Sequence, residues 1–353
     1  MARQDMTVPE ITVRGGGIFG LACAYELARR GARLRLIDPA GVAAGATGGL
    51  VGALSPHMPE NWNPKKQFQL ESLLAAEAFW AGVAAAGGHD PGYARSGRLQ
   101  PLADAAAVAQ AERRAGSAGE LWRGAAVWRV VPASGAAWEP ASPTGVLIHD
   151  TLSARLSPRQ AAASLVAALR ALGAEVIEGR DAPDHGLVLH ATGWQGLTEL
   201  GLALGRPVGS GVKGQAAAFQ LAVADQPQLY AGGLHLVPHA DGTVAVGSTS
   251  ENTWATADAV DDQLEALIDS ARALVPALTE APVVERWAGI RPRARSRAPI
   301  LGGWPGRPGH FIANGGFKIG FGMAPGVAAV MADLMLEGRD GIPDGFRVED
   351  SLR

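Results

Sequence analysis

A glycine-rich turn near the start of the chain constrains its fold more than any other feature. Gly15, Gly17 and Gly20 have the G-x-G-x-x-G spacing, they follow a short apolar run, and a second apolar run ends at Asp38. Gly15 allows the sharp exit from a strand, Gly17 lets the backbone approach a pyrophosphate, and Gly20 lets a helix pack close to a sheet. Asp38 is placed to accept hydrogen bonds from a ribose. Residues 10–38 are therefore predicted to form a strand–helix–strand unit that binds a dinucleotide.

The helix predicted after this turn adds to the same site. Its first residues, Ile18 and Phe19, lie at the N-terminus, where free N–H groups and a partial positive charge favour phosphate. The alternative is a glycine-rich turn in an ordinary α/β fold, but the strand, helix, second strand and terminal acid all agree with dinucleotide binding.

A second loop of small residues, 45–52, follows the acid. Thr47, Gly48 and Gly49 lie in it, and small side chains let backbone amides approach a planar or anionic ligand while Thr47 offers a hydroxyl. The alternative is a flexible surface loop. His57, shortly afterwards, either faces the ligand or is a structural residue, which is the commoner role for a lone histidine in a loop.

The composition limits the class of protein. A chain of 353 residues suits two domains, and a net charge of −3 gives no basic field for nucleic acid or an anionic membrane. The first residues lack the apolar core of a signal peptide, and no apolar run approaches the length of a membrane span. Cys23 is the single cysteine and excludes internal disulfides. We expect a cytoplasmic protein with no membrane partner and no metal site.

Periodicity outlines the rest of the chain. Helices are predicted over 65–86, 103–115, 158–172, 258–275 and from about 325 to 338, and the strand over 186–191 is predicted to end in a tight turn at 192–194. Residues 234–239 and 243–248 read as a hairpin that turns at 240–242. The glycine-rich loop 314–325 precedes the last helix and offers a second place where backbone amides can meet an anion or a polarised carbonyl.

These blocks together resemble the FAD-dependent D-amino-acid oxidase family, and most closely its glycine oxidase-like members. The resemblance runs through nearly the whole chain in the right order: Gly15–Gly20, Asp38, 45–52, Ala191–Gly193, Trp287–Pro292 and 314–325. It implies a fold of α/β plus α+β class, with a Rossmann-like FAD-binding domain and a discontinuous antiparallel-sheet substrate domain. The FAD-binding domain is expected to comprise residues 1–90, 150–205 and 300–353, and the substrate-binding domain residues 91–149 and 206–299.

The resemblance also implies how the cofactor is held. The backbone near Val176 is expected at the adenine, Thr192 and Gly193 belong to the family's central motif, and the loop with Gly316, Lys318 and Ile319 is expected at the pyrimidine end of the flavin. Some relatives attach FAD through a cysteine near the C-terminus. Because the only cysteine here lies far from that region, we predict non-covalent FAD.

The family's substrate-carboxylate arginine falls on Arg291. A guanidinium offers a planar pair of donors that matches a carboxylate, and Arg291 ends an otherwise apolar strand, where an unpaired charge would be costly. The alternative is a structural ion pair or a solvated run with Arg293, Arg295 and Arg297.

Three positions depart from the pattern of glycine oxidase-like sequences. His235 stands where a tyrosine is usual, Ser250 replaces a methionine, and Lys318 replaces an arginine. We expect His57, His235, Ser250 and Arg291 to contact substrate, with His235 touching its carboxylate or tuning its amine. Lys318 either lies beside the flavin or faces solvent. The more polar pocket suggests a polar or larger amine.

The resemblance implies an enzyme that oxidises the C–N bond of a small amino acid or amine, of the D-amino acid or glycine/sarcosine type. Hydride would pass to flavin N5, and O2 is expected to reoxidise the flavin. Arg291, His235 and Lys318 are the expected catalytic residues. The alternatives are a flavin oxidoreductase for a modified tRNA base, a dehydrogenase that uses another electron carrier, and a non-catalytic flavin-binding module. Near-neutral charge argues against the tRNA reading.

Overall fold

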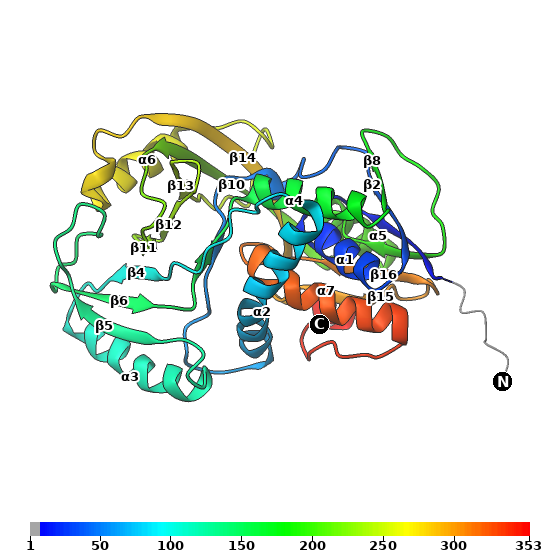
Figure 1. The fold of residues 1–353 in the computed structure, drawn as a ribbon, viewed down its shortest axis with the longest axis horizontal. Coiled ribbons are helices and arrows are strands. Elements are labelled where there is room, and N and C mark those ends of the chain that lie inside the picture. The colour runs from blue at the N-terminus through cyan, green and yellow to red at the C-terminus, as the bar shows by residue number, and fades with distance from the viewer. Residues whose placement is uncertain (1–7) are drawn as a thin grey trace.

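A computed structural model describes residues 8–353, which build two sheets with helices around them (Figure 1). The first sheet has six strands in the order β15-β16-β9-β1-β2-β8. All neighbours pair in parallel except β15 and β16, which are antiparallel. The strands are β1 (Glu10–Arg14), β2 (Arg33–Asp38), β8 (Glu175–Glu178), β9 (Leu187–His190), β15 (Ile300–Gly303) and β16 (His310–Asn314). From β8 through β2, β1 and β9 the order is the 3-2-1-4 arrangement of a classic dinucleotide-binding sheet, whereas the last two strands, β16 and β15, are exchanged and pair antiparallel.

Four helices pack with one another beside this sheet: α1 (Ile18–Arg29), α2 (Pro64–Gly87), α4 (Pro158–Ala171) and α7 (Gly320–Glu337). Their apolar faces meet in one buried cluster, because residues such as Leu21, Leu27, Leu165 and Val327 recur at helical spacing. A shorter helix, α5 (Gly193–Ala203), contacts β16 of this sheet and two strands of the other.

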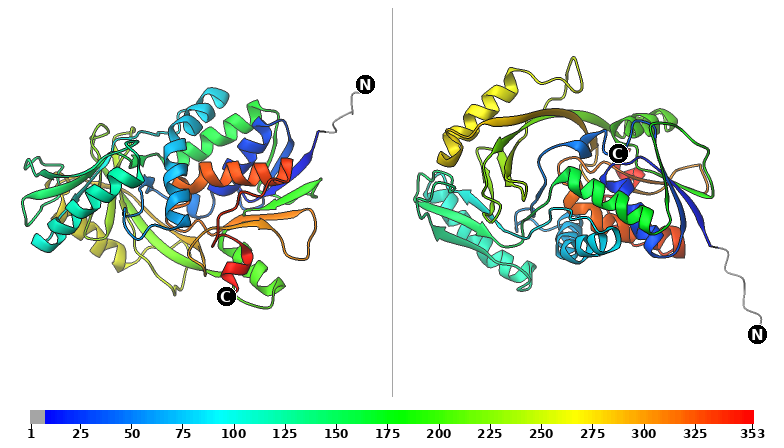
Figure 2. Two further views of the ribbon diagram at one scale, coloured as in Figure 1. Left: turned by 90° about the horizontal axis from the view of Figure 1, so that it is seen from below. Right: turned by 45° about the horizontal axis from the view of Figure 1, so that its top comes forward.

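The second sheet has eight strands in the order β14-β10-β13-β12-β11-β4-β6-β5. They are β4 (Arg98–Pro101), β5 (Trp128–Pro132), β6 (Val146–Asp150), β10 (Gly209–Gln220), β11 (Gln228–Ala231), β12 (Leu234–Pro238), β13 (Thr243–Gly247) and β14 (Val283–Ala294). Only β4 and β11 pair in parallel. The helices α3 (Ala105–Leu121) and α6 (Asp262–Leu274) lie on the outer side of this half, away from the N-terminal end (Figure 2).

Short elements complete the chain. They are the two-stranded sheet of β3 (Ala53–Leu54) and β7 (Ala154–Arg155) and the 3-10 turns η1 (Ala46–Gly48), η2 (Pro276–Leu278) and η3 (Val348–Ser351). Chain segments 98–150 and 209–294 supply every strand of the eight-stranded sheet. The discontinuous two-sheet fold is thus confirmed, while the domain boundaries themselves stay a prediction.

Three sequence-based expectations need correction. Residues 193–203 form helix α5 where only a tight turn was expected, and α3 continues to Leu121 rather than stopping near 115. The last helix begins at Gly320 rather than near 325, so Pro325 lies inside it. Proline often occupies the first turn of a helix, which is why its position suggested the start.

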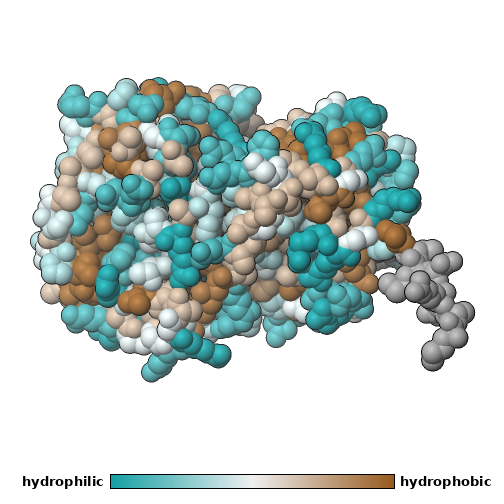
Figure 3. All heavy atoms as spheres, in the orientation of Figure 1, coloured by the Kyte–Doolittle hydropathy of each residue, from teal (hydrophilic) through white to brown (hydrophobic). Residues whose placement is uncertain are grey.

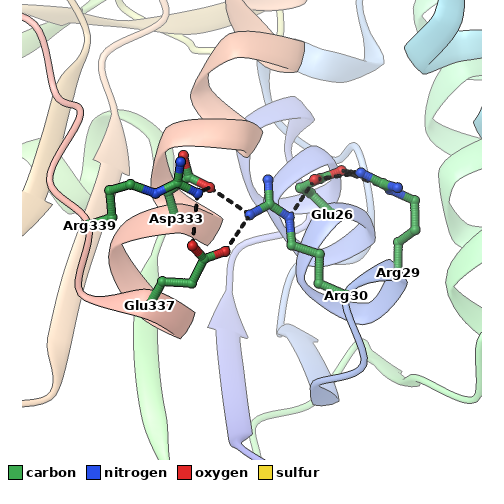
Figure 4. A network of polar contacts seen from close by, with 6 residues as sticks. All are labelled: Glu26, Arg29, Arg30, Asp333, Glu337 and Arg339. Carbon is green, nitrogen blue, oxygen red and sulfur yellow. Dashed lines mark hydrogen bonds and ion pairs between the residues drawn. The ribbon is translucent and has the colours of Figure 1, made fainter.

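The helices α1 and α7 are joined by a network of charged side chains at their C-terminal ends (Figure 4). Arg30 donates to Glu26 on its own helix and to Asp333 on α7, across 2.7 and 2.6 Å. Burial opposes the charge of Glu26, but hydrogen bonds from Arg29 and Arg30 hold the pKa of its carboxyl below the usual range. The network holds the C-terminal ends of the two helices together, and the helices pack against each other.

Helix α7 is long and apolar enough to cross a membrane by length and composition, so the expectation that no run reaches that length was wrong. Half of its apolar window is buried against the rest of the protein, as in the core helix of a globular fold. Polar and apolar residues are interspersed over the face of the molecule seen in Figure 3.

Candidate functional site

A cavity of about 1030 Å³ is lined by residues of both sheets. One part of its wall comes from the turn after β1, the end of β2 and the loop around η1. The other comes from β10, β12 and β14 and the loop before α7. Segments that are distant in the sequence therefore meet around one space, and most of the predicted site residues lie along it.

The glycine turn forms the floor of the cavity. Gly15 has φ +106°, and a Cβ there would lie 2.4 Å from the carbonyl oxygen of Ala191. A Cβ on Gly20 would lie 1.9 Å from the carbonyl oxygen of Gly15, so only glycine lets α1 start this close to the turn. Gly15 and Gly17 line the cavity, whereas Gly20 sits behind them and supports the turn.

Free hydrogen-bond donors face this floor. The backbone N–H group of Phe19, which lines the cavity, has no acceptor within residues 8–353, and that of Ile18 donates to Thr47 Oγ1 across 2.9 Å. Thr47 therefore holds the second loop against the start of α1 and keeps its own hydroxyl hydrogen for a ligand. Donors and helix dipole together form a site for phosphate.

Asp38 lines the cavity at the end of β2. Its carboxylate accepts hydrogen bonds from the backbone N–H groups of Gly16 at 2.6 Å and Ala40 at 3.0 Å. These bonds fix the side chain beside the glycine turn and leave lone pairs free for hydroxyl donors. The position is the one that the sequence predicts for binding a ribose.

The start of α7 lies next to the start of α1. A Cβ on Gly320 would lie 3.3 Å from Cγ2 of Ile18, and one on Gly316 would lie 2.9 Å from the ring of Phe19. Asn314 Nδ2 donates to the carbonyl oxygen of Gly193 across 2.8 Å and so connects β16 to α5. Two helix N-termini therefore converge on one cavity.

These features fit a dinucleotide such as FAD. A Cβ at Gly17 would meet only Thr47 Oγ1, at 3.4 Å, so the glycine leaves open space on the cavity side of the turn. Gly17, Thr47, Thr192, Gly193 and Gly316 all line the cavity. An extended ligand that carries phosphates at its middle and a polarised carbonyl at one end could use both helix N-termini.

Arg291 lies on the cavity wall formed by β14 and is 9% exposed. Its Nη2 donates to the carbonyl oxygens of Lys213 and Thr249 across 3.1 and 2.7 Å, and its Nη1 donates to the hydroxyl oxygen of Ser248 across 2.6 Å. Nε has no partner within the described residues. A guanidinium has five N–H donors, so Nε–H and one Nη1–H are unused, and because Nε is buried, one Nη1–H remains for a ligand.

The charge around Arg291 is not balanced. Behind it, buried Lys213 lies 3.7 Å from Glu251, whose carboxylate also accepts from Gln215 Nε2 at 3.0 Å. Two buried cations therefore share one buried carboxylate, while the exposed carboxylate of Asp261 lies near Lys213 and accepts from the same Gln215 amide at 2.8 Å. Burial lowers the pKa of Arg291 to about 10, with Glu251 partly offsetting the effect, so the guanidinium stays charged at neutral pH. The excess positive charge favours an anionic ligand in the cavity.

A second cation, Lys318, lines the same cavity. Its Nζ lies 5.8 Å from the centre of the Phe317 ring, and the guanidinium carbon of Arg291 lies 5.5 Å from that centre. Burial, and then the charge of Arg291, lower the pKa of Lys318. The two positive charges therefore face a shared region around Phe317.

His235 lines the cavity on β12. Its ring lies 4.8 Å from that of Tyr230, its cross-strand neighbour on β11. Burial, followed by the charges of Arg98 and Lys318, lowers the pKa of His235 to about 3. The imidazole is therefore neutral at physiological pH.

Several predicted residues do not line the cavity. Gly48, Val176, Ile319, His57 and Ser250 are all absent from its walls. Val176 pairs with Leu36 in the sheet, and Ile319 caps α7. His57 hydrogen bonds to Gln69 through both its backbone and its ring, and Ser250 is exposed. Their predicted contacts with cofactor or substrate gain no support from these positions.

Other residues on the wall were missed by the sequence reading: Tyr230, Ser248, Trp287 and Phe317. Ser248 is two residues before the serine that was singled out, directly after β13. Tyr230 faces His235 only because β11 and β12 pair in that register. The hairpin over 234–248 was recognisable, but the sequence does not reveal which strand lies beside it.

Comparison with known proteins agrees with this geometry. Residues 10–334 match the family model described as DAO, FAD dependent oxidoreductase. The chain is 30% identical over 364 residues to the glycine oxidase of Pseudomonas putida, covering 92% of this chain and 94% of the relative. Identity to the glycine oxidase of Geobacillus kaustophilus is 26% over 365 residues, covering 92% of each chain. The crystal structure of glycine oxidase from Geobacillus kaustophilus has a TM-score of 0.81 over 97% of this chain and 99% of that one, at 23% identity.

Proposed function

Because the chain belongs to the DAO family of FAD-dependent oxidoreductases, we propose that it oxidises the carbon–nitrogen bond of a small amino acid or amine that carries a carboxylate. The observation that carries this proposal is Arg291. It is a buried cation with unused donors, and it lies on the cavity wall opposite the glycine turn of a dinucleotide site. Similarity to proteins named glycine oxidase supports an amino-acid or amine substrate.

The cofactor of this family is FAD. The free N–H group of Phe19 and the hydroxyl of Thr47 would hold its phosphates, and Asp38 would accept from its ribose. Bound FAD would supply the acceptor for the hydride that leaves the substrate carbon. We propose that FAD is held non-covalently, because Cys23 is fully buried in α1 and burial keeps its thiol protonated.

The chain's own contribution is orientation. Arg291 and Ser248 would bind the substrate carboxylate through a guanidinium N–H and a hydroxyl, and this would hold the adjacent carbon against the cofactor. The carbonyl oxygens of Lys213 and Thr249 fix the guanidinium plane in advance, so little freedom remains to be lost on binding. The apolar rings of Trp287 and Phe317 on the same wall would exclude water from the reacting atoms.

Oxygen is the electron acceptor that we propose, and the cytoplasm is the proposed location. The decisive test is anaerobic. Purified protein should carry a flavin spectrum, and glycine, sarcosine, proline or a D-amino acid should bleach it under nitrogen. Readmitted oxygen should then restore the colour with release of hydrogen peroxide. A colourless protein that takes up no FAD would contradict the cofactor site, and a flavin that no amine bleaches would contradict the substrate class.

A further inference from the structure

The cavity holds more positive charge than one carboxylate requires. Arg291 already has Ser248 and two carbonyl oxygens around it, whereas Lys318 donates to no acceptor and pairs with no carboxylate in the described part of the chain. Lys318 and Arg291 lie 5.8 and 5.5 Å from the centre of the same Phe317 ring. Two cations thus lie near the same aromatic ring, and Lys318, an exposed residue on the cavity wall, has no partner in the described part of the chain.

His235 adds a hydrogen-bond donor beside Lys318. Its Nδ1 is buried without a partner, while Nε2 is not enclosed in this way and the residue lines the cavity. A buried N–H without an acceptor is rarer than a buried lone pair without a donor, so we assign the single proton of the neutral ring to Nε2. Nε2–H then offers a neutral donor to the cavity that Lys318 also lines.

We propose that Lys318 and His235 form a second anion subsite, and that the natural substrate is an amine with two anionic groups, such as an amino dicarboxylate. Arg291 and Ser248 would take the carboxylate next to the reacting carbon, and Lys318 with His235 Nε2–H would take the other. The inference rests on the proposed function, because it concerns the substrate of the same site.

The charges near this subsite favour the assignment. Arg98, the other cation felt by His235, donates through Nε to the buried carboxylate of Asp150 across 3.0 Å, which balances its charge although its Nη2 has no partner within the described residues. Glu251 lies on the far side of Arg291 among Lys213 and Gln215. A ligand with one carboxylate would leave Lys318 and the His235 donor without partners, whereas a second anion would satisfy both.

The test compares ligands that differ by a single carboxylate. Sarcosine and iminodiacetate form one pair, and D-alanine and D-aspartate form another. The half-saturation concentration for anaerobic bleaching of the FAD-loaded protein would be measured for each. Propionate and succinate, which cannot be oxidised, would be compared by their effect on the visible flavin spectrum. We expect the second carboxylate to tighten binding by about tenfold or more in all three pairs.

Variants test whether Lys318 causes the preference for a second carboxylate. Lys318→Met should bring the ratio within each pair close to one, and Lys318→Arg should retain a preference. Arg293→Met is the matched control, because Arg293 lies 5.8 Å from the same Phe317 ring but outside the cavity wall, and it should keep the wild-type ratio. Since Lys318 makes no hydrogen bond within residues 8–353, its replacement should not disturb folding.

The possible failures are distinguishable. If no amine bleaches the flavin, the proposed function is wrong. If monocarboxylates bleach it and the second carboxylate brings no gain, the function stands and the second subsite is wrong. If Lys318→Met keeps the ratio but shifts the midpoint potential of the flavin, Lys318 acts on the cofactor and the subsite is again refuted.

Discussion

Arg291 Nη1 and the hydroxyl oxygen of Ser248 lie 2.6 Å apart, so the hydroxyl accepts from the guanidinium and must turn its own hydrogen elsewhere. Both residues line the cavity. The pair therefore presents one guanidinium N–H and one O–H to the same space, which is the donor set that a carboxylate requires.

Ser248→Ala should weaken substrate binding. The change removes one donor to the carboxylate and one acceptor from Arg291, and a charge-assisted hydrogen bond contributes about 1.5–3 kcal/mol, so KM should rise about tenfold or more. Steady-state kinetics would measure it. Ser250→Ala is the matched control, because Ser250 is exposed and outside the cavity wall, and it should change KM by less than about twofold. The reverse pattern would assign the contact to Ser250.

Arg291→Lys should lower kcat/KM by about a hundredfold or more, because an ammonium cannot reach the two carbonyl oxygens, Ser248 and a carboxylate at once. FAD content should stay the same, since Arg291 is not part of the glycine turn. Arg286→Lys on the same strand alters an exposed pair with Glu265 and should have little effect. Kinetics and flavin absorbance check both, and unchanged kinetics in Arg291→Lys would refute the carboxylate role.

Gly214→Ala tests whether the guanidinium position matters. A Cβ at Gly214 would lie 2.2 Å from Nη2 of Arg291, so the side chain must move and lose its carbonyl contacts. We expect KM to rise about tenfold or more with FAD binding retained. Gly303→Ala, where no atom lies within 4 Å of the new Cβ, is the control for a glycine replaced in a strand. Equal KM values in the two variants would contradict this account.

Local signals in the sequence predict the cofactor half of the molecule well. The turn of Gly15, Gly17 and Gly20 depends on contacts between residues that are close in the sequence, and Asp38 ends the second strand of the same βαβ unit. Helix α5 was missed because Thr192 makes no side-chain cap and Gly196 weakens the helical signal. Gly196 lets the helix pack closely: a Cβ there would lie 3.1 Å from Nδ2 of Asn314 on β16. Such close packing leaves no periodic signal.

The substrate half depends on contacts between strands that are distant in sequence. Arg291 could be recognised from its family motif, whereas Ser248 becomes its partner only because β10 lies between β13 and β14. In the same way, Tyr230 meets His235 through the register of β11 and β12. A single sequence shows the strands but not their order in the sheet. It therefore suggests the chemistry of this cavity wall without showing which residues form it.

Thr47→Val should weaken FAD binding about tenfold. Valine has nearly the same shape but cannot accept from the Ile18 N–H, now 2.9 Å from Thr47 Oγ1, or donate to a phosphate. Titration of the apoprotein with FAD, followed by flavin fluorescence, measures the change. Thr198→Val, at an exposed position on α5, is the control. An unchanged dissociation constant would remove Thr47 from the phosphate site.

The preference for a second carboxylate should depend on pH through Lys318. Burial and the charge of Arg291 lower the pKa of this ammonium below its ordinary value of 10.5. A cation is charged below its pKa, so the preference should be complete at neutral pH and should disappear as the pH rises through a value below 10.5. In Lys318→Met this step should be missing.

The same profile tests the neutral state of His235. Since its pKa is about 3 rather than the ordinary 6.5, His235 should not change charge between pH 5 and neutral pH, and the ratio of half-saturation concentrations for iminodiacetate and sarcosine should be flat over that range. A charged imidazole would strengthen the second anion subsite, so a preference that grows as the pH falls through 6.5 would show that His235 titrates normally. His235→Gln, which keeps an N–H donor but cannot titrate, should retain the flat profile and would remove any such step.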